Sequence, residues 1–117
     1  MGSPIVHFEI VGKDGERLEA FYKKLFDWKI ERQTPGGFQY GHIKKGEAGP
    51  ISGGIRHEPK GKADVVVYFA VEDVEAAVKS AQSLGATLHV PPREFGDLKF
   101  AVIRDPEGNS IGVIEKN

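Results

Sequence analysis

The sequence predicts an α+β protein made of two βαβββ modules, and two observations lead to this prediction. The strand-like stretch IVHFEIV at residues 5–11 has a counterpart, VVYFAVE, at residues 66–72. Each copy is followed by an acidic residue, an amphipathic helical pattern and a series of short strand-like segments. We expect the two modules to pair so that a curved mixed sheet encloses a trough, with the helices covering the outer faces.

The first strand-like stretch, residues 5–11, places its side chains on two faces. In an extended strand, alternate residues point to opposite sides. Val6, Phe8 and Ile10 therefore share an apolar face that we expect to lie against the helix. His7 and Glu9 share the opposite face, which would line the trough.

A helix is predicted after this strand, because Asp14 can cap its first turn and apolar residues then recur at helical spacing. These apolar residues are Leu18, Phe21, Tyr22 and Leu25. The helix is expected to end near Asp27 and Trp28. Strands follow over residues 28–32, 38–44 and 53–57, with glycine- and proline-containing turns between them.

The second module repeats this order. Asp73 is placed to cap a helix whose apolar residues recur at the same spacing, and Gly85 provides a natural left-handed stop. The apolar residues of this helix are Val74, Ala77, Val78 and Ala81. Three strands are expected over residues 87–90, 98–104 and 110–115, separated by a turn at Pro91-Pro92 and a turn at residues 105–109.

The length of 117 residues fits one domain, residues 1–117. Within it, module one is expected to span about residues 4–57 and module two about residues 64–116. The polar segment between them, about residues 58–63, reads as a linker. A unit of roughly sixty residues is too small to bury both faces of its sheet alone, so the modules must pair. They can do so within one chain or by exchange with a partner chain.

The composition is that of a globular protein and excludes several classes of function. A formal net charge of −1 gives no basic footprint for nucleic acid or for an anionic membrane. The absence of cysteine excludes disulfides, thiolate zinc sites and thiol nucleophiles. No apolar run approaches the ~18 residues of a membrane span, and the N-terminus lacks a signal-peptide pattern. We therefore expect a cytoplasmic protein.

Four stretches together resemble the vicinal oxygen chelate superfamily, in particular its small glyoxalase/bleomycin resistance/dioxygenase-like members. They are IVHFEI before an acidic helix start, the helix end EAFYKKLFDW, the second opening VYFAVEDVEAAV and the closing DPEGNSIGVIE. The resemblance covers essentially the whole chain. It implies the paired βαβββ fold and, in the enzymes, a divalent metal ion held in the trough by the first and fourth strands of each module.

The resemblance also implies a site, carried over residue by residue. Aligning Gly54 with Gly112 pairs His57 with Glu115 on the fourth strands, while the first strands contribute one residue each. The four family positions then read His7, His57, Tyr68 and Glu115.

This set implies metal chemistry. Two imidazoles and a carboxylate, from His7, His57 and Glu115, suit Fe(II), Mn, Ni, Co or Zn with open positions for substrate. Glu115 is also the candidate base, and Tyr68 is a candidate hydrogen-bond donor or general acid. His42 has no counterpart in the repeat and is given no role.

Three functions remain open on the sequence. The first is a divalent-metal-dependent enzyme of the glyoxalase type, with lyase, isomerase or dioxygenase chemistry on a small oxygenated substrate. The second is a metal-free protein that binds a small molecule, such as a bleomycin-like antibiotic, without catalysis. The third is a scaffold with neither property. The resemblance further implies a homodimer, and the net charge indicates no nucleic acid or membrane as partner.

Overall fold

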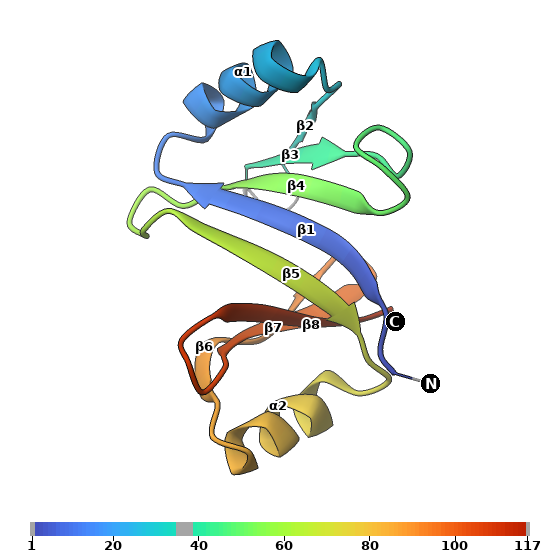
Figure 1. Ribbon diagram of the computed structural model, residues 1–117, viewed down its shortest axis with the longest axis vertical. Helices are drawn as coiled ribbons and strands as arrows, with labels where there is room; N and C mark the ends of the chain where they lie inside the picture. The colour runs from blue at the N-terminus through green and yellow to red at the C-terminus, as the bar shows by residue number, and fades with distance from the viewer. Residues whose placement is uncertain (1, 35–38, 117) are drawn as a thin grey trace. The chain divides into compact units, whose positions relative to one another are not determined.

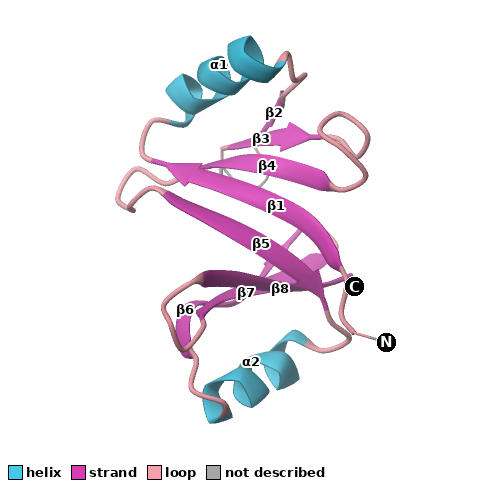
Figure 2. Cartoon of the chain, in the orientation of Figure 1, coloured by secondary structure: helices cyan, strands magenta, loops and turns pink. Residues whose placement is uncertain are grey.

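The structure, a computed structural model, describes residues 2–34 and 39–116, and the chain divides into two compact units. The His7 unit comprises residues 7–65, and the Tyr68 unit comprises residues 66–117 together with residues 1–6. Among the described residues, each unit has one helix and a mixed sheet (Figures 1 and 2). The trough expected between the modules stays a prediction.

The His7 unit has the predicted order of strand, helix and strands. Its elements are β1 (Ile5–Gly12), α1 (Gly15–Phe26), β2 (Glu31–Gln33), β3 (Tyr40–Ile43) and β4 (Ser52–His57). The strand order is β2-β3-β4-β1, with β1 and β4 parallel and the other pairs antiparallel. The strand expected to start at Trp28 starts only at Glu31, and Phe38, the expected start of the next one, lies outside the described residues.

The first helix begins as the sequence predicts, but only Leu18 and Tyr22 of its apolar residues pack against the sheet, whereas Phe21 and Leu25 are exposed. The carboxylate of Asp14 accepts a hydrogen bond from the backbone N–H of Arg17 at 3.1 Å, which caps the first turn. Phe8 and Ile10 of β1 pack on this side of the sheet against a buried cluster and apolar side chains of the helix. The buried cluster consists of Ile30, Ile43 and Ile55. Alternation along β1 therefore leaves His7 and Glu9 on the opposite face.

The Tyr68 unit repeats the arrangement. Its elements are β5 (Asp64–Ala70), α2 (Val74–Ser83), β6 (Thr87–Phe95), β7 (Leu98–Arg104) and β8 (Ser110–Lys116). The strand order is β5-β8-β7-β6, with β5 and β8 parallel. Asp73 caps α2 through the N–H of Ala76 at 3.0 Å, and Gly85 follows the helix with φ 103°. Its core joins α2 to β7 and β8 through Val74, Val78, Ala101, Ile103 and Val113.

One predicted turn is wrong. Pro91 and Pro92 were expected to end the strand at Val90, but β6 continues through them to Phe95. The pairing with β7 shifts register between Val90 and Arg93, so the prolines fall where the ladder is interrupted. A proline lacks the N–H that a regular ladder needs, and an irregularity of this kind accommodates it.

No helix in the part of the chain that the structure describes is long and apolar enough to cross a membrane.

Candidate functional site

Strand register decides which polar side chains share a face in the His7 unit. His7 on β1 is paired with Ser52 on β4, and Tyr40 on β3 is paired with Arg56 on β4. Paired residues point to the same side of a sheet, and residues an even number apart along a strand do so too. His7, Glu9, Ser52, Tyr40 and Arg56 therefore lie together on the face opposite α1.

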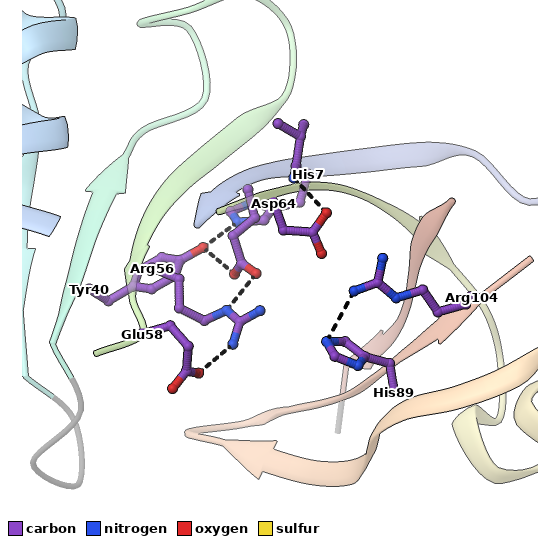
Figure 3. Close-up of polar contacts among 9 residues, drawn as sticks. His7, Tyr40, Arg56, Glu58, Asp64, His89 and Arg104 are labelled. Atoms are coloured by element: carbon purple, nitrogen blue, oxygen red, sulfur yellow. Dashed lines mark hydrogen bonds and ion pairs between the residues drawn. The ribbon is translucent and has the colours of Figure 1, made fainter. Parts of the chain in front are cut away.

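These side chains form a connected hydrogen-bonded network. Figure 3 labels His7, Tyr40 and Arg56 among them. The Nδ1 atom of His7 lies 2.7 Å from Ser52 Oγ, and its Nε2 atom lies 2.8 Å from Tyr40 Oη. The Tyr40 hydroxyl donates to Glu9 Oε2 at 3.0 Å. Both nitrogens of His7 are thus engaged by side chains of the same unit.

The far end of the network is a buried ion pair. Arg56 Nε donates to Glu9 Oε1 at 2.9 Å, and a second guanidinium nitrogen donates to Glu58 Oε2 at 3.0 Å. Glu9, Arg56 and Tyr40 are only 4, 7 and 7% exposed. Buried charges need such partners, because an unpaired charge in this position would be strongly destabilising. The network, here called the His7 network, comprises His7, Glu9, Tyr40, Ser52, Arg56 and Glu58.

A glycine makes room for the tyrosine at the centre of this network. A Cβ atom placed on Gly54 would lie 2.0 Å from Tyr40 Oη, which no packing tolerates. The Tyr40 ring therefore crosses β4 directly above Gly54 and reaches β1. Only glycine at this position lets Tyr40 contact both His7 and Glu9.

The environment keeps His7 uncharged at neutral pH. Burial lowers the pKa of His7 from 6.5 to about 4, and the nearby His42 contributes a smaller lowering in the same direction. His42 lies on the same sheet face, because it is two residues from Tyr40 on β3. The sequence interpretation gave His42 no role, whereas the structure makes it part of the surroundings of His7.

The structure does not bring His57 to His7. His57 is paired with Gly12 and His7 with Ser52, so the two histidines are five residues apart along the β1–β4 pair, about 16 Å. An odd spacing also puts them on opposite faces. His57 Nε2 contacts Glu19 Oε2 of α1 at 2.7 Å, on the helix side.

Tyr68 and Glu115 are separated in a similar way in the Tyr68 unit. Tyr68 is paired with Gly112, and Glu115 lies three residues further along β8, on the other face. Tyr68 is 2% exposed and packs edge-on against Phe100, with ring centroids 6.2 Å apart. Glu115 Oε1 instead accepts the backbone N–H of Val74 at 2.6 Å, at the start of α2.

Glu115 does belong to an acidic group that could hold a metal ion. Oxygen atoms of Asp73, Glu75 and Glu115 lie within 4.8 Å of one another. Lys99 already pairs with Glu75, at 3.0 Å, and Val74 donates to Glu115. This group contains carboxylates only, whereas the set expected from the resemblance combined a carboxylate with two imidazoles.

The register also revises the comparison between the repeats. Gly112 is paired with Tyr68, and its counterpart Gly54 is paired with Glu9 rather than with His7. Counting from these pairs, the counterpart of Tyr68 is Glu9, and that of His7 is Val66. The second unit therefore has no polar counterpart of His7 at this position.

Sequence reasoning found His7 and Glu9 on one face but missed three partners. Tyr40, Ser52 and Arg56 lie 31 to 47 residues away in sequence from the β1 residues they contact. The signal available was alternation along β4, which puts Ser52 and Arg56 on one face and Ile55 and His57 on the other.

Comparison with known proteins gives one family match. Residues 4–113 match the Glyoxalase/Bleomycin resistance protein/Dioxygenase superfamily. A protein named "Putative glyoxylase CFP32" is 26% identical over 110 residues, in Mycobacterium bovis and in Mycobacterium tuberculosis. The match covers 89% of this chain but 42% of that protein, so the chain spans less than half the length of these relatives.

Solved structures share the fold at low sequence identity. A hypothetical protein from Bacillus halodurans has a TM-score of 0.69 at 12% identity, covering 100% of this chain and 96% of its own. Methylmalonyl-CoA epimerase from Streptomyces coelicolor, in complex with 2-nitronate-propionyl-CoA, has a TM-score of 0.65 at 15% identity, covering 97% of both chains. The epimerase from Mycobacterium tuberculosis gives 0.59 at 17% identity, covering 97% of this chain and 87% of its own. These matches confirm the predicted α+β glyoxalase-type fold.

Proposed function

Because the chain belongs to the Glyoxalase/Bleomycin resistance protein/Dioxygenase superfamily, we propose that it binds a small oxygenated molecule and catalyses proton transfer on it. The observation that carries this proposal is the His7 network. A neutral imidazole hydrogen-bonded at both nitrogens is held in a fixed position and can exchange hydrogen bonds with a bound oxygen. The fold relatives named as epimerases and the relatives named as glyoxylases agree with chemistry of this class.

The donors expected for a divalent ion do not meet at one point in the His7 unit. Fe, Mn, Ni, Co or Zn would need the imidazoles of His7 and His57 and a carboxylate at one point. The two imidazoles point to opposite faces of the His7 unit and each has a protein partner. These donors do not fit one ion, so the proposed chemistry relies on side chains alone.

The test measures exchange of carbon-bound hydrogen. The protein, prepared without a histidine tag and treated with a chelator, is incubated in D₂O with hydroxyacetone or pyruvate. Proton NMR then follows loss of the signal next to the carbonyl. We expect exchange above the buffer rate for the wild type and its loss in His7→Gln. His89→Gln is the control, because His89 is exposed and lies outside the network.

A metal-free binding protein without catalysis is the second candidate, and one observation favours it. Both oxygens of Glu9 and both nitrogens of His7 have protein partners, so the network is complete without substrate. Binding of either compound without hydrogen exchange would select this candidate. Exchange that persists unchanged in His7→Gln would rule out the proposed role of the network.

We also propose that the protein is a homodimer, as the resemblance implies. Light scattering coupled to size exclusion gives the mass directly. A mass near 12.8 kDa, that of one chain, would contradict this proposal.

A further inference from the structure

Three large apolar side chains at the C-terminal half of α1 face solvent. Phe21, Leu25 and Phe26 are each between 52 and 57% exposed, whereas Leu18 and Tyr22 pack toward the sheet. The exposed three are neighbours on the helix, because residues four apart or adjacent to the same ring lie side by side. Contiguous apolar surface of this kind marks a place where another molecule binds. These three residues are here called the α1 patch.

The rings of the α1 patch are held in place by other aromatic side chains. Tyr22 meets Phe21 edge-on with ring centroids 5.0 Å apart, and it stacks on Phe26 at 6.0 Å. Trp28 packs against Phe26 at 5.2 Å and against Tyr22 at 5.6 Å. An aromatic surface that is already ordered loses little side-chain entropy when a partner covers it. The patch is therefore suited to binding in its present conformation.

The charges of α1 are separated along the helix. Asp14 and Glu16 lie at its start, and Lys23 and Lys24 lie in its last turn. When two copies of such a helix lie antiparallel, the acidic start of each faces the basic end of the other, and their dipoles are also opposed. Parallel copies would bring like charges together. Arg17 departs from the pattern, but in the antiparallel arrangement it reaches the aromatic rings of the other copy, on which a guanidinium can stack.

We infer that the α1 patch binds the same patch on a second copy of this chain, with the two α1 helices antiparallel across a twofold axis. This inference rests on the proposed homodimer and assigns its interface. A twofold interface uses one surface on both chains, so that surface must complement itself. The apolar side chains form the centre of the interface, and the charged helix ends form its rim.

The size of the patch sets the strength of the dimer. Phe21 and Phe26, each about half-exposed, together offer on the order of 200 Å² of apolar surface per chain, and Leu25 adds to it. This suits the apolar centre of an interface that buries about 800 Å² per partner. We expect a dissociation constant in the micromolar range, so the dimer should depend on concentration.

The first experiment measures this equilibrium by sedimentation velocity between about 5 and about 500 μM chain, which brackets a micromolar Kd. Phe21→Ser and Leu25→Ser should each raise Kd roughly 10-fold, because each removes an apolar side chain from the centre of the interface. Leu84→Ser is the matched control, since Leu84 is 77% exposed and follows α2 in the Tyr68 unit. It should leave Kd unchanged. All three positions are exposed, so the variants should fold, which circular dichroism checks.

The second experiment reads the direction of the two helices. A carbodiimide joins a carboxylate directly to a lysine amine where the two are in contact, and an equal mixture of nitrogen-15-labelled and unlabelled chains marks links between chains. We expect links from Asp14 or Glu16 to Lys23 or Lys24 that combine a labelled with an unlabelled peptide. A dimer that gives no mixed link between these residues would overturn the antiparallel arrangement.

The outcomes separate the interface from the homodimer on which it rests. A wild type that keeps the mass of one chain, 12.8 kDa, at every concentration would overturn both. A wild-type dimer whose Kd is the same in Phe21→Ser and Leu25→Ser would leave the homodimer standing and overturn its assignment to α1. A dimer weakened by these two substitutions and unaffected by Leu84→Ser supports both.

Discussion

At the scale of a single residue, His7 makes stability depend on pH. The unfolded chain takes up a proton on His7 with a pKa of 6.5, whereas burial lowers the pKa in the folded protein to about 4. Between these values the unfolded state binds more protons, so stability falls as pH falls from 6.5 to about 4. The contribution is fully present above pH 6.5 and amounts to as much as ~3 kcal/mol.

Urea unfolding at pH 4.5 and at pH 7.5 measures this effect. Because other groups titrate too, the comparison is between the wild type and His7→Gln, which cannot titrate there. The loss of stability on acidification should be smaller in His7→Gln by ~2–3 kcal/mol. His89→Gln should behave as the wild type. Equal losses in all three proteins would show that His7 is not held neutral by the fold.

Gly54 provides a second prediction at this scale. Gly54→Ala places a Cβ 2.0 Å from Tyr40 Oη, so the ring must move and its contacts with His7 and Glu9 are lost. Overpacking of this kind costs about 1–3 kcal/mol. Gly112→Ala is the matched control, since its Cβ would meet the Tyr68 ring at 2.3 Å. Urea unfolding should show a loss for both, but only Gly54→Ala should change the His7 nitrogen-15 signals.

The sequence could predict part of this site. Alternation in IVHFEIV puts His7 and Glu9 on the face opposite the helix, and the structure confirms it. The same rule applied to β4 places His57 on the helix face, two residues from Ile55. The family resemblance instead implied that His57 shares a metal site with His7. Tyr40 and Arg56 could not be assigned, because their contacts depend on which residues pair across strands distant in sequence.

At the scale of the element, α1 is fastened to the sheet by a buried carboxylate. Glu19 is 4% exposed and accepts from His57 Nε2 at 2.7 Å and from Arg32 at 3.1 Å. Two glycines make room for this contact. A Cβ on Gly15 would lie 2.0 Å from His57, and one on Gly41 would lie 2.8 Å from Glu19. His57 therefore has a structural partner on the helix side of the unit.

Removing this charge should loosen the helix. Glu19→Gln removes the buried carboxylate beside His57, whereas the exposed Arg32 keeps Glu16 at 3.6 Å. We expect a destabilisation of about 1–3 kcal/mol in urea unfolding, because a buried polar contact is lost. Glu75→Gln is the control, because Glu75 is half-exposed and its pair with Lys99 is screened by water. It should leave the unfolding midpoint unchanged. Equal effects of the two substitutions would contradict the anchoring role of Glu19.

Elements were predictable where local signals are strong. The caps Asp14 and Asp73 and the stop at Gly85 fix both helices, and the structure confirms all three. The prediction failed at Pro91-Pro92, where local chemistry favours a turn. Pairing with β7 stabilises the extended chain on both sides of the prolines. The prolines lack backbone N–H groups, and the register shift places them where the ladder needs no such donor.

At the scale of the whole molecule, strand β1 contributes residues to both units, and this should couple their unfolding. Its residues Ile5 and Val6 belong to the Tyr68 unit and the rest of the strand to the His7 unit. The carbonyl of Pro4 accepts from the N–H of Ala70 at 2.9 Å, so the start of the chain is tied to the Tyr68 unit. Units of roughly sixty residues are marginal by themselves. Because β1 contributes residues to both units, we expect unfolding of one unit to disturb the other.

We therefore expect residues 1–117 to unfold in one cooperative step, as a single domain should. Trp28 is the only tryptophan and reports on the His7 unit through its fluorescence. NMR signals of Val74 and Val78, both in the core of the Tyr68 unit, report on the other. The two probes should give the same urea midpoint. Replacing Pro4 and Ile5 by glycine should lower both midpoints together, whereas a midpoint that shifts for Val74 and Val78 alone would show that the units unfold independently.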